Sequence, residues 1–308
     1  MYCQMVGRGT RLCEGKTELL LLDFLWHTER HELCRPAHLI CENPEVAEKM
    51  TKNLAEQAGC TVDIEQAEQT AAREYEGTIY YDRLILGKWV RAEGAIYRKF
   101  ADSPNRYYCR VVDSIDPDLP YRQFLRSQLR DITIGIDFGG NRSGHAFTAT
   151  AHTGDYRELI ALRSERHLEE CDPNDIDRIA LDFAQAVLDS FGMPEHVYWD
   201  NAETVLGRGI KKAFEKRFPS THVHGARKAA INDRIRCATR LMGADRFFYT
   251  DGCMTLKTAL SEAVWNDKSK HDERLDDGST DIDTLDSFDY TFERDMKRYI
   301  RAVQNGDH

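Results

Sequence analysis

Three aspartates occupy positions from which they could bind a divalent cation. Asp137 follows the apolar run ITIGI, Asp200 follows HVYW, and Asp286 lies in the helix-prone stretch DIDTLDSFDYTFE. A carboxylate at the end of an apolar strand is costly to bury unless it is paired or binds a metal. Oxygen ligands without cysteine or paired histidine favour Mg²⁺ or Mn²⁺ over zinc. We therefore expect Asp137, Asp200 and Asp286 to hold two such ions. Asp283 lies three residues before Asp286, on the same helical face, and can join them.

These acids also have a less specific interpretation. An aspartate at the end of a strand often forms a turn or caps the following helix, and neither role needs a metal. The acids follow the order strand, strand, helix, however, and strand ends in a sheet with parallel elements meet at one edge. Two hard cations at such an edge can activate water and stabilise the leaving oxygen in phosphodiester cleavage. The order of the acids therefore favours a site for this reaction.

Charge is segregated along the chain, although the net charge of −10 does not suggest binding to nucleic acid. Basic residues gather between 207 and 240, and acidic residues gather between 272 and 289. A basic band beside an acidic cluster suits a metal-dependent nuclease, whereas two solvated faces are the alternative. The basic residues that we expect to contact DNA are Lys211, Lys212, Arg227, Lys228 and Arg234.

The chain from Asp131 onward alternates strand and helix patterns, which predicts an α/β fold. Strands are expected over 131–140, 144–155, 156–166, 196–200, 221–225 and 246–250. Helices are expected over 172–192, 204–218, 228–242, 253–265 and 283–303. Upstream, residues 75–100 are expected to form a short helix, a turn at Gly94 and a strand. Residues 101–130 are expected to form a linker that ends in a helix at 120–130.

Composition excludes several classes of protein. No apolar run approaches the roughly 20 residues that span a bilayer, so no membrane segment is expected. The nine cysteines are odd in number and never spaced C-x-x-C, which argues against a disulfide framework and a zinc knuckle. His27 and His31 have no third ligand nearby in the sequence. With no apolar signal core at the start, the chain is expected in a reducing cytoplasm.

The first 24 residues contain GRGTRLCEGKT, which is not a phosphate loop. The pattern G-x-x-x-x-G-K-[ST] requires a glycine at position 10, where the chain has Thr10. Residues 4 to 11 instead resemble the end of the second RecA-like lobe of DEAD/DEAH-type superfamily 2 helicases. In that resemblance Gln4, Arg8 and Arg11 form a vestigial motif. Without a phosphate cradle or a magnesium carboxylate, we expect no ATPase activity.

Four later phrases, GIDFGGNRSGHAF, VYWDNAE, KAAINDRI and DIDTLDSFDYTFE, carry a second resemblance. Together with LGKWVRAEGAIY upstream, they look like the C-terminal nuclease domain of phage terminase large subunits, over residues 75–308. The resemblance implies an RNase H-like mixed sheet flanked by helices, with a small helical and strand appendage at the N-terminus. It places Asp137, Asp200 and Asp286 among the metal-binding acids and Asp283 beside them. Lys228, Asp233 and Arg234 match a charged helix start near the site.

The two resemblances divide the chain into a helicase-like fragment (1–74), a terminase linker segment (75–130) and a nuclease domain (131–308). They imply a two-metal DNA endonuclease that cleaves concatemeric viral DNA during packaging but lacks its own ATPase domain. Its partners would be double-stranded DNA and the portal or small terminase subunit. The alternative is a catalytically silent prophage remnant or fusion that acts as a DNA- or partner-binding module. Nicking of plasmid in the presence of a divalent cation would separate the two.

Overall fold

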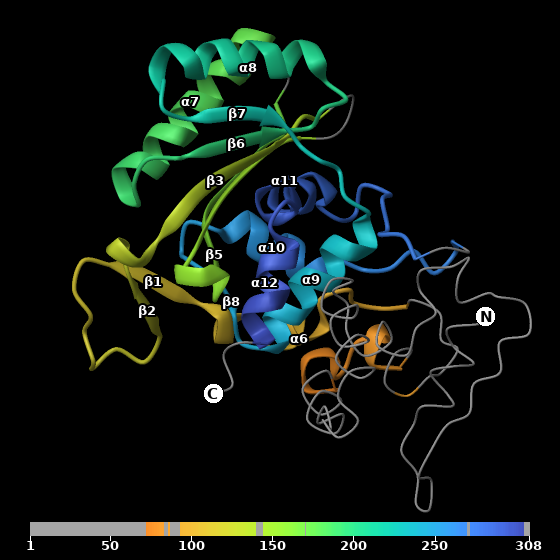
Figure 1. The fold of residues 1–308 in the computed structure, drawn as a ribbon. Helices are drawn as coiled ribbons and strands as arrows, with labels where there is room; N and C mark the ends of the chain where they lie inside the picture. Colours follow the sequence, from red (N-terminus) through yellow and green to blue (C-terminus); the bar gives the residue numbers. More distant parts are fainter. Residues whose placement is uncertain are drawn as a thin grey trace, which may run out of the picture. The chain divides into compact units, whose positions relative to one another are not determined.

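The computed structural model describes residues 72–82, 86, 93–139, 144–169, 171–269 and 272–304 (Figure 1). The chain divides into two compact units, Met1–Val90 and Arg91–His308, and the predicted acids lie in the second. The helicase-like segment with Gln4, Arg8 and Arg11 lies outside the described residues, so its interpretation stays a prediction. Among the described helices, none is long and apolar enough to cross a membrane.

A six-stranded mixed sheet forms the centre of the second unit. Its strand order is β7-β6-β3-β4-β5-β8. The strands are β3 (Arg130–Asp137), β4 (His145–His152), β5 (Leu159–His167), β6 (His196–Trp199), β7 (His222–Gly225) and β8 (Phe247–Tyr249). β3, β4 and β5 form an antiparallel meander, β6 and β7 run parallel to β3, and β8 runs parallel to β5. This arrangement is an RNase H-like mixed sheet, and it confirms the predicted α/β fold.

Helices cover both faces of the sheet (Figure 1). α7 (Pro173–Ser190) and α8 (Thr204–Arg217) lie on one face. On the opposite face α11 packs against β3 and β4, together with the other C-terminal helices. These are α9 (Ile231–Gly243), α10 (Met254–Glu262), α11 (Ile282–Phe292) and α12 (Met296–Gln304). The two helical layers match the two-sided burial of the central strands.

The alternation along β3 explains how one strand serves both layers. Ile132, Ile134 and Ile136 belong to the apolar core shared with α7 and α8. Side chains two apart point to the same face of a strand, so Gly135 and Asp137 face α11. A Cβ at Gly135 would lie 1.8 Å from the backbone oxygen of Ser287, so only glycine lets α11 cross so close. This close crossing brings the acids of α11 to the end of β3.

Three expected elements differ in the structure. The helix expected at 120–130 is strand β2 (Arg122–Leu125) followed by a 3₁₀ turn (Arg126–Gln128), and β2 pairs in parallel with β1 (Cys109–Val112). Phe124 is buried against Phe248, so burial in the tertiary structure overrides the local helix pattern. The strand expected before residue 100 is replaced by helix α6 (Arg98–Asp102). Its Phe100 is fully buried against Tyr107 and the rings of β8.

The single helix expected over 283–303 is two helices. α11 ends at Phe292, and α12 begins at Met296. Glu293, in the break, is buried, and its carboxylate accepts hydrogen bonds from a loop far away in the sequence. These contacts can form only once the fold is complete, and a helical periodicity in the sequence cannot reveal them.

Candidate metal-binding site

Two of the predicted acids lie at adjacent strand ends. Asp137 is the last residue of β3 and is 8% exposed. Ile136 pairs with Trp199 in the parallel β3–β6 ladder, and the backbone N–H of Asp200 donates to the oxygen of Ile136 over 3.0 Å. The carboxyl ends of β3 and β6 therefore bring Asp137 and Asp200 to the same edge of the sheet, as their positions after apolar strands predicted.

Asp137 lies within the electrostatic field of the other three acids. Burial, together with the charges of Asp286, Asp200 and Asp283, raises its pKa to about 8. The hydroxyl of Tyr290 donates a 3.1 Å hydrogen bond to Asp137, which opposes the shift. Asp137 is therefore largely protonated at neutral pH in the absence of an added cation. All four acids predicted from the sequence lie close enough together to interact.

Asp200 is paired with a lysine whose loop is held from the other side of the site. The ammonium of Lys228 contacts the carboxylate of Asp200. Lys228 has a positive φ of 53°, an uncommon conformation for a residue other than glycine. The carboxylate of Glu293, 1% exposed, accepts three consecutive backbone N–H groups, from Arg227 (2.5 Å), Lys228 (3.0 Å) and Ala229 (2.8 Å). These bonds hold the loop in the conformation that places Lys228 at Asp200.

Asp286 belongs to a network with two buried arginines. It lies 3.0 Å from Arg274 and 3.5 Å from Arg234. Burial raises the pKa of Asp286, while the positive charge of Arg274 acts in the opposite direction. Arg274 also binds Asp289, at 2.5 Å, and Asp289 is fully buried. The network holds the carboxylate of Asp286 on the face of α11 that is turned toward Asp137.

Asp283 lies one turn earlier on α11 and is bound to the β3–β4 side. Its Oδ2 accepts hydrogen bonds from the backbone N–H of Gly144 (2.8 Å) and from Arg166 (2.6 Å). Arg166 also pairs with Asp281 at 3.2 Å, and Asp281 caps the start of α11. Asp283 therefore fixes the start of α11 against the sheet, besides contributing negative charge to the site.

The donor set suits a hard divalent cation, because its acids are oxygen ligands in a crowded negative field. In the part of the chain that the structure describes, no three His, Cys, Asp or Glu side chains are already arranged to hold a metal ion. Three of the acids instead form ion pairs with cationic side chains: Asp200 with Lys228, Asp286 with Arg274 and Arg234, and Asp283 with Arg166. The lysine, on a flexible stem, is the cation that a metal ion could most readily displace.

The basic residues predicted to contact DNA fall into two groups. Lys211 and Lys212 are exposed on α8, and Arg227 is exposed after β7. Lys228 is engaged with Asp200. Arg234 is only 7% exposed, and its guanidinium contacts Asp286 and Asp289. Its position therefore suits stabilisation of the acids rather than a DNA contact, because a buried paired guanidinium cannot reach a phosphate. Asp233, also expected near the site, pairs with Arg236 at the surface.

Four further residues shape the site and were not singled out in the sequence: Arg166, Arg274, Glu293 and Tyr290. Tyr290 had a local signal, since it lies four residues after Asp286 and hence on the same helical face. The other three had none. Arg166 donates a hydrogen bond to Asp283, 117 residues away in the sequence, and Glu293 accepts one from Arg227, 66 residues away. Such pairings depend on the folded topology.

Comparisons with known proteins agree with this fold. No family model and no curated protein matches the chain. Among solved structures, the large terminase of a thermophilic bacteriophage aligns with a TM-score of 0.55 and 18% identity, over 74% of this chain and 51% of that chain. A second crystal form of the same terminase gives 0.55 and 17%, over 77% and 53%. The Mn-bound nuclease domain of the bacteriophage SPP1 large terminase gives 0.42 and 18%, over 61% and 96%.

The chain therefore has the fold of part of a phage large terminase. It spans about half the length of the terminase from the thermophilic phage. At this level of identity the likeness extends to the fold, and it confirms the fold expected from the sequence resemblance. The activity, substrate and partners of the chain are proposals.

Proposed function

We propose that this chain is a metal-dependent DNA endonuclease of the terminase type. The observation that carries the proposal is Asp137, a buried carboxylate at a strand end, set among Asp200, Asp283 and Asp286 so closely that its pKa rises to about 8. A buried carboxylate set among other acids is unfavourable when it ionises, and a divalent cation that neutralises it makes ionisation favourable. Fold likeness to phage large terminases adds support at the level of architecture.

Asp137, Asp200 and Asp286 would hold two Mg²⁺ or Mn²⁺ ions, with Asp283 accessory. Bound ions would supply an activated water and charge stabilisation at the leaving oxygen. The chain's own residues would have supporting roles. Tyr290 would orient Asp137, and the loop held by Glu293 would keep Lys228 beside Asp200. Arg274 keeps Asp286 in place.

Double-stranded DNA is the proposed substrate. The exposed cations Lys211, Lys212 and Arg227 would contact phosphates, which gives affinity with little reading of sequence. In a host bacterium the reaction would be the cutting of concatemeric viral DNA during packaging, alongside a portal or small terminase subunit. No ATPase activity is proposed for the chain.

Cleavage of supercoiled plasmid tests the proposal. The full chain should nick or linearise the plasmid with Mn²⁺ or Mg²⁺, and EDTA should abolish this. Asp137→Asn, Asp200→Asn and Asp286→Asn should each abolish or greatly reduce cleavage, because asparagine keeps the size of the side chain and loses the charge that binds cations. Asp155→Asn is the matched control, since Asp155 is exposed in a turn and asparagine tolerates its positive φ. Cleavage undiminished in chelator would contradict the metal mechanism.

A second candidate is a catalytically silent module that binds DNA or a partner protein. It is favoured by the ion pairs that Asp200, Asp283 and Asp286 already make with lysine or arginine. Thermal denaturation separates the candidates independently of cleavage. Mn²⁺ should raise the melting temperature of the parent more than that of Asp137→Asn, because a ligand of the native state stabilises it by mass action. An equal rise in both, together with intact plasmid, would favour the silent module.

A further inference from the structure

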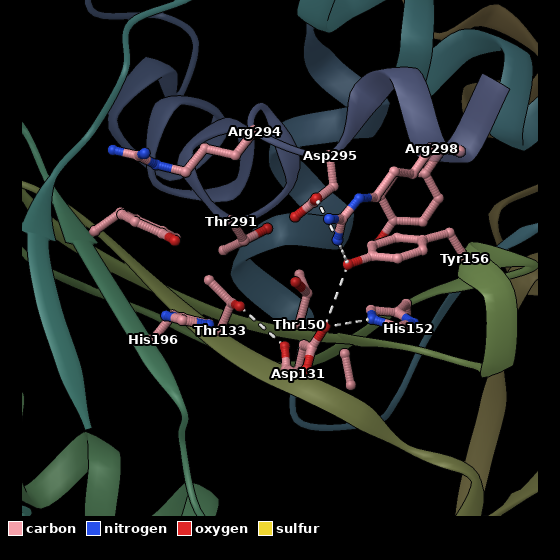
Figure 2. A pocket seen from close by; sticks show the side chains of 13 residues that line it. Asp131, Thr133, Thr150, His152, Tyr156, His196, Thr291, Arg294, Asp295 and Arg298 are labelled. Atoms are coloured by element: carbon pink, nitrogen blue, oxygen red, sulfur yellow. Dashed lines mark hydrogen bonds and ion pairs between the residues drawn. The ribbon is translucent and has the colours of Figure 1, made fainter. Parts of the chain in front are cut away.

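A cavity of about 220 Å³ lies away from the acids, between the sheet and the junction of α11 with α12 (Figure 2). Its sheet wall includes Asp131 and Thr133 of β3 and His196 of β6, and its helical wall includes Arg294 and Arg298. Thr133 and Asp137 lie on the same face of β3, four residues apart, which corresponds to about 13 Å along a strand. That separation equals about four base-pair rises of DNA. The cavity is therefore within reach of a DNA strand that passes the acids.

Side chains of β6 and β7 line the surface between the acids and the cavity. His196 and Tyr198 share one face of β6, and Asp200 continues the same alternation. Together with His222 and His224 on β7 they form an array of four stacked rings, with neighbouring planes inclined by 12–30° and centroids 5.6–6.5 Å apart. The guanidinium of Arg294 lies 4.6 Å from the Tyr198 ring. His222 and His224 are exposed, so this ring array forms an accessible aromatic surface that leads from the acids to the cavity.

The charges of the cavity are balanced. Arg298 pairs with Asp295 at 3.2 Å, and Asp131 lies 2.9 Å from the ring of His152. Figure 2 shows these pairs together with the hydroxyl of Tyr156, which donates to Asp131. A bare phosphate would meet the carboxylates of Asp131 and Asp295 as well as the guanidinium groups of Arg294 and Arg298, so the lining has no excess of positive charge that would select an anion. A neutral ligand with several hydrogen-bonding groups fits the lining better.

One polar atom of the wall lacks a partner. The Nδ1 of His196 is buried and makes no hydrogen bond with any of the described residues. Burial lowers the pKa of His196, so its ring is neutral near pH 7. A buried polar atom without a partner is destabilising, so a ligand or water that pairs with it is favoured. Because the cavity is smaller than the ~300 Å³ of a typical pocket for a drug-sized ligand, the ligand should be a single ring system.

We propose that this cavity receives the base of an unpaired DNA nucleotide, a few nucleotides from the bond that is cut. The base stacks on the ring array of β6 and β7 and hydrogen-bonds to the hydroxyls, the histidine and the acids of the wall. This proposal rests on the proposed endonuclease function. It adds that the bound strand is locally unpaired beside the cleavage point, as stacking sites for single strands require.

The test uses short single-stranded DNA that carries one 2-aminopurine, moved along the strand in successive oligonucleotides. The full chain with Asp137→Asn is used in EDTA, so that no strand is cut. Binding should change the fluorescence at one position in particular. His196→Ala combined with Tyr198→Leu should abolish that change and weaken binding on the order of tenfold. Tyr121→Leu is the control, because Tyr121 packs on Tyr108 beside the β1–β2 pair and lies outside the cavity.

A second measurement avoids variants in the cavity. Single-stranded DNA with 4-thiothymidine at the responsive position should crosslink, on irradiation, to the peptide that contains His196 and Tyr198. Crosslinks confined to other peptides, or equal affinity of the cavity variant and the Tyr121→Leu control, would overturn the proposal. If these arms succeed while plasmid stays uncut with Mn²⁺, the proposed endonuclease function fails and the base site stands. If plasmid is cut and these arms fail, the proposed endonuclease function stands and the proposed base site is wrong.

Discussion

Replacing Asp137 with asparagine should stabilise the protein in the absence of added metal, and more so at higher pH. Burial and the neighbouring acids raise the pKa of Asp137 from an ordinary value of 3.8 to about 8. Between these values the folded state holds a proton that the unfolded state has lost, so stability falls as pH rises from about 4 to 8. Each pKa unit corresponds to about 1.4 kcal/mol. The raised pKa of Asp137 therefore lowers the free energy of unfolding by about 2 kcal/mol at pH 5 and by about 5 kcal/mol at pH 8.

Asparagine removes this cost because it has no proton to lose, and its oxygen can still accept the hydrogen bond from Tyr290. The free energy of unfolding of Asp137→Asn should therefore exceed that of the parent by about 3 kcal/mol more at pH 8 than at pH 5. Urea denaturation of the full chain in EDTA, followed by circular dichroism at both pH values, measures the difference. Asp155→Asn controls for the general effect of losing an exposed carboxylate.

The reasoning would be refuted by a stability gain that does not depend on pH, or by a loss of stability at pH 8. Either result would mean that Asp137 is ionised in the folded protein at no cost, and hence that the four acids do not share one site. A gain that grows between pH 5 and pH 8, and is removed by Mn²⁺, would support both the clustering and the binding of cations.

Three other substitutions probe how the site is held, each by urea denaturation at pH 7. Gly135→Ala should lower the free energy of unfolding by about 3 kcal/mol, because its Cβ would lie 1.8 Å from the backbone of α11. A decrease of less than about 1 kcal/mol would mean that the helix can move aside. Glu293→Gln should lower the free energy of unfolding by about 3 kcal/mol, because three backbone N–H groups lose a charged acceptor. Glu262→Gln is the control and should leave the stability almost unchanged, because Glu262 is exposed. Arg274→Met should lower the free energy of unfolding by about 3–5 kcal/mol, because it leaves Asp289 buried without its closest cation. Parent-like stability would show that Arg274 does not stabilise the buried acids.

The position of Asp289 also changes how the acids should be tested. By its sequence position, three residues after Asp286, it would serve as a neutral control that behaves like the parent. It is fully buried and bound to Arg274 and Arg234, so Asp289→Asn would disturb the same network that holds Asp286. Loss of cleavage in that variant would not identify a metal ligand. Asp155 is the better control because its carboxylate is exposed.

Much of the nuclease-like fold could be predicted from the sequence. The central strands, the helices α7 to α10 and the placement of Asp137 and Asp200 after apolar strands all follow from local periodicity. This is possible because the preference for strand or helix is set by residues two to four positions apart. The grouping of Asp137 with Asp200 could also be expected, since parallel strands end at a common edge. Asp286 was added to them from the order of the acids along the chain and from the family resemblance, and it reaches them through the close crossing of α11 at Gly135.

The tertiary structure alone decided what surrounds the acids. β2 forms where a helix was expected because Phe124 finds a buried partner in Phe248, far along the chain. The break between α11 and α12 occurs where Glu293 binds the loop that carries Lys228. The ion pairs of Arg166 and the cavity beside His196 likewise join segments distant in sequence. Charges and cavities of this kind depend on distances in space between remote segments, and no local pattern of residues encodes those distances.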